Sequence, residues 1–501
     1  MPLSLATARQ VRGEVLCEKR KLGLMEILAF LTEILGFIGR MSNGLTGPQD
    51  LITVCCIRYA VPLIPIRGGA VPAWPGGRRT KMGSKLGIVS RWQLCACTCM
   101  AILATAFVGS GQVAGAAGTK AGGSAINIQI DVPYNLPVAS QPESIAAAQA
   151  AVDAINKNGG VNGHKLSLGV CNTDLNPSSS VACITKAISS HAVATVGDFD
   201  FPADSQDFTL LNNAKIPAIG PLVADAPPAT SPASFPLNGS TLEEYAGAGY
   251  ALKTIPGVKT VAIAENPIPG YIEQGITLAG LKFVGPIVTL PQSVTDYSSY
   301  AASLKATGAD AVVASTSFGQ FQPLVKAATQ LNYYPKWVTV APNVQQNEVS
   351  SDLAPLGSKV VQNIIVMAAL VPYGETSNAG IRQFQQELAA ARAKGVANAG
   401  AGLVDEFALG AWLSVHTLAN VAEHISGPIT GASVTKALNH TKALKMYGLM
   451  PAWTPSTVGL KKFPRVSNPN LYVAHITKGD KVTLVSTKTI SLAHFPFSET
   501  S

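Results

Sequence analysis

The sequence predicts an α/β protein built from two doubly wound modules of parallel sheet. Strand-like and helix-like segments alternate from Ala125 onward, which is typical of parallel strands joined by right-handed helical crossovers. The alternation starts again after residues 227–240, a stretch rich in Pro, Ser and Gly, so it describes two modules. Hydrophobic residues make up 47% and charged residues 13% of the 501 residues, as in folded chains.

The first module opens with an alternating strand and an amphipathic helix. Isoleucines alternate over residues 126–130 as on the buried face of a strand. Apolar residues at helical spacing then run to a Gly pair at 159–160, where a helix should end. Asn176 followed by Pro177 predicts a capped helix start with proline in its first turn. The other elements expected in this module are strands 165–171 and 192–197 and helix 178–190.

The second module repeats this logic at similar size. We expect strands 258–264, 286–290, 309–314 and 336–341, helices 271–283, 297–306 and 320–331, and a closing apolar run at 360–370. Three later helices belong to neither series in simple order, at residues 379–394, 403–425 and 434–444. Two further strands, 471–476 and 481–486, flank a Lys-Gly-Asp-Lys sequence that predicts a hairpin turn.

The net charge of +8 comes from the start of the chain. Thirteen of the 37 Lys and Arg residues but only five of the 29 Asp and Glu residues lie before Gly118, so 24 of each remain in the rest. A neutral body without a run of basic residues lacks the electrostatic footprint that phosphate backbones require. We therefore expect no nucleic-acid partner.

Residues 82–117 have the pattern of a secretory signal peptide. Lys85 and Arg91 form the basic region, residues 94–108 the apolar core, and small residues up to Ala117 suit cleavage. We therefore expect export. A retained membrane anchor is the alternative, for which the core is short. Residues 1–81 fit neither a signal nor a domain, so we expect translation to begin at residue 82; a disordered extension is the alternative.

Cysteine placement agrees with export. Cys171 and Cys183 are the only cysteines after residue 117, and two cysteines outside the cytosol usually pair, so we predict a disulfide. Two cysteines are too few for a structural zinc site. Cys97 faintly resembles the cysteine of a lipoprotein box, but the apolar core continues beyond it, so lipid anchoring at the cell surface is the weaker alternative.

Several phrases resemble the leucine/isoleucine/valine-type periplasmic binding proteins of ABC transporters. Residues 145–163, which end in AVDAINKNGGVNG, resemble that family's first helix and turn. Residues 296–298 and 308–313 resemble a helix start and the following strand of its second lobe, and residues 405–418 its returning helix. The resemblance covers roughly residues 124–490, and the order and spacing of the phrases are its specific feature.

This resemblance implies the type I periplasmic binding protein fold, in which two lobes are joined by three crossings and a hinge, with ligand in the cleft. It implies that residues 118–243 and 372–445 form lobe 1, that residues 244–371 and 446–490 form lobe 2, and that residues 491–501 form a tail. It also implies an extracytoplasmic monomer, in the periplasm or at the cell surface, that captures an amino acid or related solute for an ABC transporter permease, without a cofactor or metal.

In open α/β sheets, ligands bind at the carboxyl ends of the strands, so loops after strands supply the candidate ligand-binding residues. These are Asp198, Phe199, Asp200, Phe201, Leu222, Glu265, Asn266, Tyr271, Ser315, Thr316, Ser317 and Phe318. The two aspartates could pair with a ligand cation, or could instead cap the following helix. The resemblance adds Glu406 on the returning helix, where an acid is also favoured by the helix dipole.

One departure from the family bears on the ligand. Members that bind α-amino acids usually carry paired Ser or Thr residues after the third strand, where this chain has Asp198-Phe199-Asp200. The ligand class is therefore open to cationic, amide or partly apolar solutes. We expect no enzyme, because the seven His residues show no metal-ligand spacing and no nucleophile elbow is present. The alternative function is a ligand-sensing module of a signalling system, which predicts a receptor gene rather than permease and ATPase genes nearby.

Overall fold

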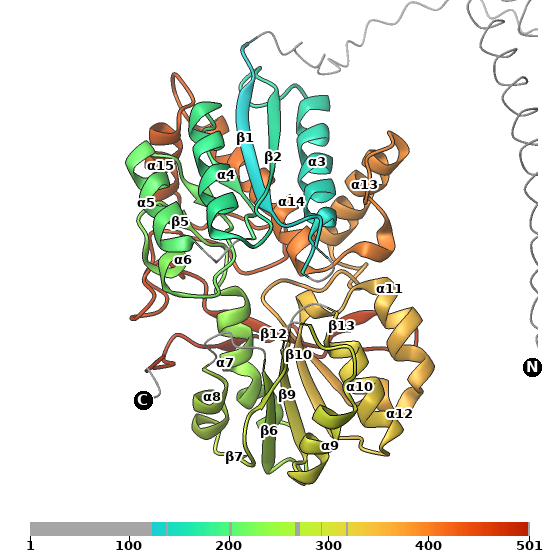
Figure 1. Cartoon of the computed structure of the whole chain (residues 1–501). Coiled ribbons are helices and arrows are strands. Elements are labelled where there is room, and N and C mark those ends of the chain that lie inside the picture. The colour runs from blue at the N-terminus through green and yellow to red at the C-terminus, as the bar shows by residue number, and fades with distance from the viewer. Residues whose placement is uncertain are drawn as a thin grey trace, which may run out of the picture. The chain divides into compact units, whose positions relative to one another are not determined.

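The computed structural model describes residues 123–136, 139–199, 203–265, 271–291, 293–316 and 319–498 (Figure 1). In this part of the chain the strands form two sheets, and helices pack on both. The predicted signal peptide and the extension before it lie outside the described residues. Among the described helices, none combines the length and the apolar character that crossing a membrane would require.

The first sheet has five parallel strands in the order β2-β1-β3-β4-β5. These are β1 (Ile126–Val132), β2 (Leu166–Asn172), β3 (Thr195–Val196), β4 (Ala218–Ile219) and β5 (Ser234–Phe235). The connecting helices are α3 (Pro142–Lys157), α4 (Pro177–Ser189), α5 (Asp204–Ala214) and α6 (Ala226–Thr230). The strand order reverses direction between β1 and β3, which is where doubly wound sheets bind ligands.

The second sheet has nine strands and is mixed. Its parallel part contains β6 (Thr260–Glu265), β7 (Lys282–Phe283), β8 (Val288–Thr289), β9 (Ala311–Ser315), β10 (Lys336–Val340) and β11 (Ile364–Ala368). Three late strands are antiparallel to their neighbours: β12 (Asn470–Ile476), β13 (Val482–Leu484) and β14 (Ile490–Ser491). The helices of this part include α7 (Ser240–Lys253), α8 (Ile272–Leu278), α9 (Ser298–Ala306) and α10 (Phe321–Gln330).

The chain returns to the first sheet after β11. Helices α13 (Ala379–Ala393) and α14 (Glu406–Glu423) pack against α3, and α15 (Gly431–His440) packs against α14. Helix α14 also contacts β3 and β4, and most of its residues are buried. The chain then passes back to the second sheet at β12. The three helices that fitted neither series in simple order thus complete the first layer, and the predicted two-module α/β class is confirmed.

Local signals in the sequence place several of these elements. Isoleucines at 126, 128 and 130 are buried in β1 as predicted. The side chain of Asn176 accepts hydrogen bonds from the backbone N–H groups of Ser178 and Ser179, so it caps α4. Helix α14 has the same kind of start, because Asp405 accepts a hydrogen bond from the Ala408 N–H at 2.9 Å. These caps fix where the helices begin.

The structure refines one expectation and corrects two others. The second module does begin at the end of residues 227–240, with α7, but this stretch also contains most of α6 and all of β5, the last strand of the first sheet. The helix expected over 271–283 ends at Leu278, and Gly280, at φ +79°, turns the chain into β7. The two sheets also differ in size, with five and nine strands, because the chain end adds antiparallel strands to the second.

The predicted pairing of Cys171 with Cys183 is confirmed by a disulfide that ties β2 to α4 across 12 residues. Replacing both cysteines by alanine should lower the free energy of unfolding by about 3 kcal/mol, the chain-entropy value for so short a loop. Urea unfolding of the protein with and without a reductant measures this difference. The reductant should destabilise the native protein but leave the variant unchanged, and equal stability of the native protein in both conditions would contradict a structural role.

Candidate functional site

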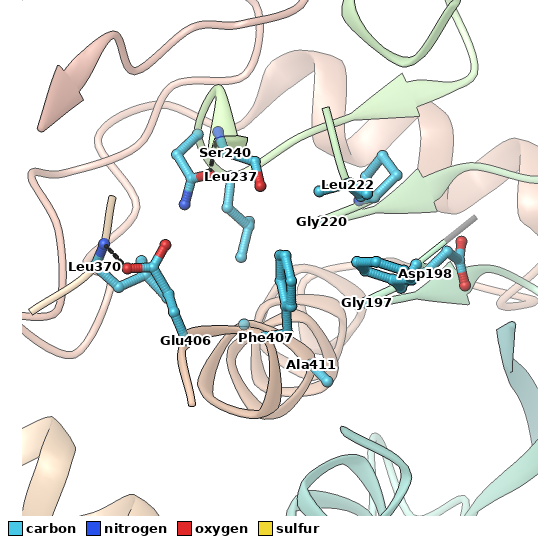
Figure 2. Close-up of a pocket in the computed structure, with 14 residues that line it drawn as sticks. Gly197, Asp198, Gly220, Leu222, Leu237, Ser240, Leu370, Glu406, Phe407 and Ala411 are labelled. Atoms are coloured by element: carbon cyan, nitrogen blue, oxygen red, sulfur yellow. Dashed lines mark hydrogen bonds between the residues drawn. The ribbon is translucent and has the colours of Figure 1, made fainter. Parts of the chain in front are cut away.

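A pocket lies where the carboxyl ends of β3 and β4 meet the N-terminal half of α14 (Figure 2). Its volume is about 40 Å³, enough for a few water molecules. The residues that line it come from the loops after β3, β4 and β5, from the segment after β11, and from α14: Gly197, Asp198, Phe199, Gly220, Pro221, Leu222, Leu237, Asn238, Ser240, Leu370, Glu406, Phe407, Gly410 and Ala411.

Close approach of α14 to the first sheet forms the floor of this pocket. Gly197 directly follows β3 and has φ +63°, a conformation that residues with a Cβ rarely adopt. A Cβ at this position would lie 2.6 Å from the Cα of Ala411 on α14. The strand end and the helix can therefore meet here only because residue 197 is glycine.

The walls of the pocket are largely apolar. The rings of Phe199 and Phe407 meet edge to face, with centroids 5.0 Å apart and an interplanar angle of 66°. Figure 2 shows the ring of Phe407 and the side chain of Leu237 beside the same space. Leu222 and Leu370 add further hydrocarbon surface. An apolar part of a small molecule would be desolvated favourably in this space.

Asp198 lines the pocket, but its carboxylate is bonded to the sheet. The Oδ1 atom accepts a hydrogen bond from the Asp131 N–H at 3.2 Å, and Oδ2 accepts one from the Thr195 hydroxyl. Figure 2 shows this carboxylate turned away from Phe407. These two bonds hold the loop after β3 in place, so Asp198 positions the ring of Phe199.

Glu406 stands at the edge of the pocket and joins three segments. Its Oε2 atom accepts hydrogen bonds from the backbone N–H groups of Ala369 at 3.0 Å and Leu370 at 3.2 Å. Its carboxyl group also forms a hydrogen bond with that of Glu244 on α7. The Ala369 N–H contacts Glu244 Oε1 as well, at 3.2 Å. Helices α7 and α14 and the segment after β11 are therefore linked through two acids.

Two carboxyl groups in contact away from water share a proton. Burial raises the pKa of Glu406, and the hydrogen bonds that it accepts from the Leu370 N–H, from Glu244 and from the Ala369 N–H lower it in part. Burial, together with the negative charge of Glu406, also raises the pKa of Glu244 well above its usual range. The protonated Glu244 donates its hydrogen to Glu406, and the pair carries one negative charge, which the two backbone N–H groups stabilise.

Four of the predicted site residues, Asp198, Phe199, Leu222 and Glu406, thus line one pocket. Four others lie elsewhere in the second sheet or beside it. Burial raises the pKa of Glu265, the last residue of β6, to about 6. The ring of Tyr271 packs edge to face on Phe497, with centroids 4.9 Å apart.

Ser315 and Thr316 are buried at the end of β9 and serve internal hydrogen bonds. Asn343 donates to the Thr316 carbonyl at 3.2 Å, and the Tyr245 hydroxyl bonds to Ser315. The remaining predicted residues lie outside the described part of the chain: Asp200, Phe201, Asn266, Ser317 and Phe318.

The residues that α14 adds to the pocket beyond Glu406 were not predicted from the sequence. Phe407, Gly410 and Ala411 follow Glu406 at spacings of one, four and five residues, so Gly410 and Glu406 share one face of the helix. Helical spacing could therefore have identified Gly410 once Glu406 was taken as a site residue. Leu237, Asn238 and Ser240 carried no such signal, because their stretch resembled a linker.

A larger groove of about 590 Å³ lies at the other end of α14. It is lined by helix ends and a loop, including exposed His424, His440 and Lys442. No strand end reaches it. Basic residues at the C-terminal ends of helices are favoured by the helix dipole, which accounts for this set without a ligand.

Two α/β layers, with a pocket at the strand ends of one of them, define a small-molecule binding protein. The sequence matches the periplasmic binding protein family over residues 136–459, and the chain belongs to this family. Its members bind solutes and are not enzymes, in agreement with the prediction from the sequence. Membership also implies a location outside the cytoplasm. No curated protein matches the sequence.

Solved structures with the same fold include three solute-binding proteins. The branched-chain amino acid transporter substrate-binding protein of Streptococcus pneumoniae, in complex with isoleucine, is 19% identical, with a TM-score of 0.58 over 73% of this chain and 99% of that chain. A solute-binding protein of Rhodopseudomonas palustris, in complex with 4-hydroxybenzoate, is 18% identical, with a TM-score of 0.59 over 74% and 97%. A fatty acid transporter substrate-binding protein of Thermomonospora curvata is 15% identical, with a TM-score of 0.60 over 74% and 94%.

Proposed function

We propose that this protein is the extracytoplasmic substrate-binding protein of an ABC transporter, and that it captures a small solute at the pocket beside α14. The observation that carries the proposal is the position of that pocket, at the carboxyl ends of parallel strands in a chain of the periplasmic binding protein family. The structural neighbours named above, which take isoleucine, 4-hydroxybenzoate or fatty acids, support a small organic solute as the ligand class.

The proposed mechanism is closure of two lobes around the solute. We propose lobe boundaries at 118–243 with 372–445, and at 244–371 with 446–490, and a permease as the partner that receives the closed form. Two contacts join the proposed lobes and support a hinge between them. Gln345 donates a hydrogen bond to Glu143 at 3.1 Å, and Glu406 meets Glu244. A solute that contacts both lobes favours the closed state by its additional contacts there.

A thermal-shift screen tests this function. The protein is melted with and without amino acids, amides, polyamines, short organic acids, aromatic acids and fatty acids. A solute at 100 times its dissociation constant should stabilise the protein by about 2.7 kcal/mol. If no solute in these classes raises the melting temperature, the proposed function is wrong.

A further inference from the structure

Gly410 is the one residue of the pocket whose lack of a side chain is not required by the fold around it. It lies inside α14, and a Cβ built on it would meet no atom within 4 Å. At Gly197, by contrast, both the positive φ and the contact with Ala411 exclude a side chain. Glycine in a helix interior also destabilises the helix. Packing and backbone geometry therefore give no reason for glycine at residue 410.

The open space at Gly410 belongs to the pocket. Gly410 lines the pocket and lies one turn after Glu406, on the same face of α14. A side chain of several carbons at this position would therefore take space from the pocket. The missing side chain keeps that volume available for a bound molecule.

The groups around this space are uncharged or already bonded. The ring of Phe407 and the side chain of Leu237 lie beside it (Figure 2), and the ring of Phe199, which also lines the pocket, packs on that of Phe407. The carboxylates of Asp198 and Glu406 accept the backbone, hydroxyl and carboxyl hydrogen bonds described above. Among the described residues that line the pocket there is no Lys, Arg or His. A free carboxylate placed deep in this space would lose its hydration without gaining a cationic partner.

We infer that Gly410 determines the depth of an apolar subsite on α14, and that this subsite takes an uncharged hydrocarbon or aromatic part of the solute. This inference rests on the proposed function and specifies its substrate class. The charged or polar end of the solute lies away from these rings, and the polar residues Asn238 and Ser240 also line the pocket. Gly410 thus acts as a specificity-determining residue for the size of the apolar part.

The test uses isothermal titration of the protein with five probes. L-Isoleucine, 4-hydroxybenzoate and octanoate carry an apolar part, whereas glycine and putrescine represent small polar solutes. The native protein should bind at least one apolar probe and neither polar probe. Gly410→Leu should weaken that binding at least tenfold, and Gly410→Ala by a smaller factor. Ala390→Leu, an exposed position on α13, is the matched control and should leave affinity unchanged.

The results test the apolar subsite at Gly410 separately from the proposed function. If the native protein binds an apolar probe and Gly410→Leu binds it equally well, the subsite is wrong and the proposed function stands. If the native protein prefers glycine or putrescine to the apolar probes, the subsite is also wrong and the proposed function stands. If none of the five probes binds, the subsite is overturned, and the wider thermal-shift screen decides whether the proposed function stands. Circular dichroism shows whether Gly410→Leu is folded; if it is not, Gly410→Ala decides by the same criterion.

Discussion

The free energy of unfolding should rise by at least about 3 kcal/mol when the pH is lowered from 7.5 to 5.5. Burial raises the pKa of Glu243 to about 8, burial next to Asp405 raises that of Glu143 to about 9, and burial next to the negative charge of Glu406 raises that of Glu244 well above its usual range. These acids are protonated in the folded protein across this window but ionised in the unfolded chain, where carboxyl pKa values are near 4. Folding therefore takes up protons.

The sign of the effect follows from that uptake. A group whose pKa is raised by folding contributes its full stability below the unfolded pKa and loses it as the pH rises through the folded pKa. One proton taken up across two pH units amounts to about 3 kcal/mol, and additional protons add to this. Burial raises the pKa of Glu387, but the hydrogen bond with His416 and the charge of His416 lower it by more. The pKa of Glu387 therefore lies below its usual value, and this group titrates below the window.

Urea unfolding at pH 5.5, 6.5 and 7.5, followed by circular dichroism, measures this dependence. Glu243→Gln should increase stability at pH 7.5 and flatten the slope, because the amide stays neutral and can still accept the hydrogen bond from the Gly239 N–H. Glu423→Gln, at an exposed position at the end of α14, is the matched control and should leave the slope unchanged. Stability that is constant or increases with pH would show that these acids do not titrate as described.

Gly197→Ala should destabilise the protein by about 3 kcal/mol. The positive φ of residue 197 disfavours any residue with a Cβ by about 1–2 kcal/mol. The new Cβ would also lie 2.6 Å from the Cα and 2.8 Å from the Cβ of Ala411, so α14 must move away from the strand end. Overpacking of this kind costs about 1–3 kcal/mol. The same shift should widen the pocket and weaken solute binding.

Gly410→Ala is the matched comparison for this variant, because it adds the same methyl group to the same pocket. Its Cβ meets no atom within 4 Å, and alanine favours the helix by about 1 kcal/mol, so this variant should be more stable than the native protein. Thermal and urea unfolding of both variants measure the two effects. If both variants change the stability in the same direction, the contact between the strand end and α14 is not what excludes a side chain at residue 197.

The local part of the fold could be predicted because its signals are short in range. The isoleucines of β1, the cap at Asn176 and the helical spacing of α3 act over a few residues, and the structure has these elements close to their predicted ends. Strand β5 was missed for the converse reason. It has only two residues and exists because β4, its neighbour in the sheet, pairs with it.

The candidate site, too, could be predicted only in part. A rule about strand ends was sufficient to select Asp198, Phe199 and Leu222, but the same rule also selected Tyr271, which packs on other aromatic rings instead. Residue type and position in the chain do not tell which way a loop turns. That direction depends on the packing of the whole layer.

Local periodicity, the cysteine count and ordered phrases were enough to predict the α/β class, the disulfide between Cys171 and Cys183, and the family to which the chain belongs. Two features could be known only from tertiary contacts: Glu244 and Glu406, 162 residues apart in the chain, share a proton, and Gly410 leaves open space in the pocket. Both features arise where α14 returns to the first sheet. Contacts between distant segments create new burial, and burial changes what each side chain can do.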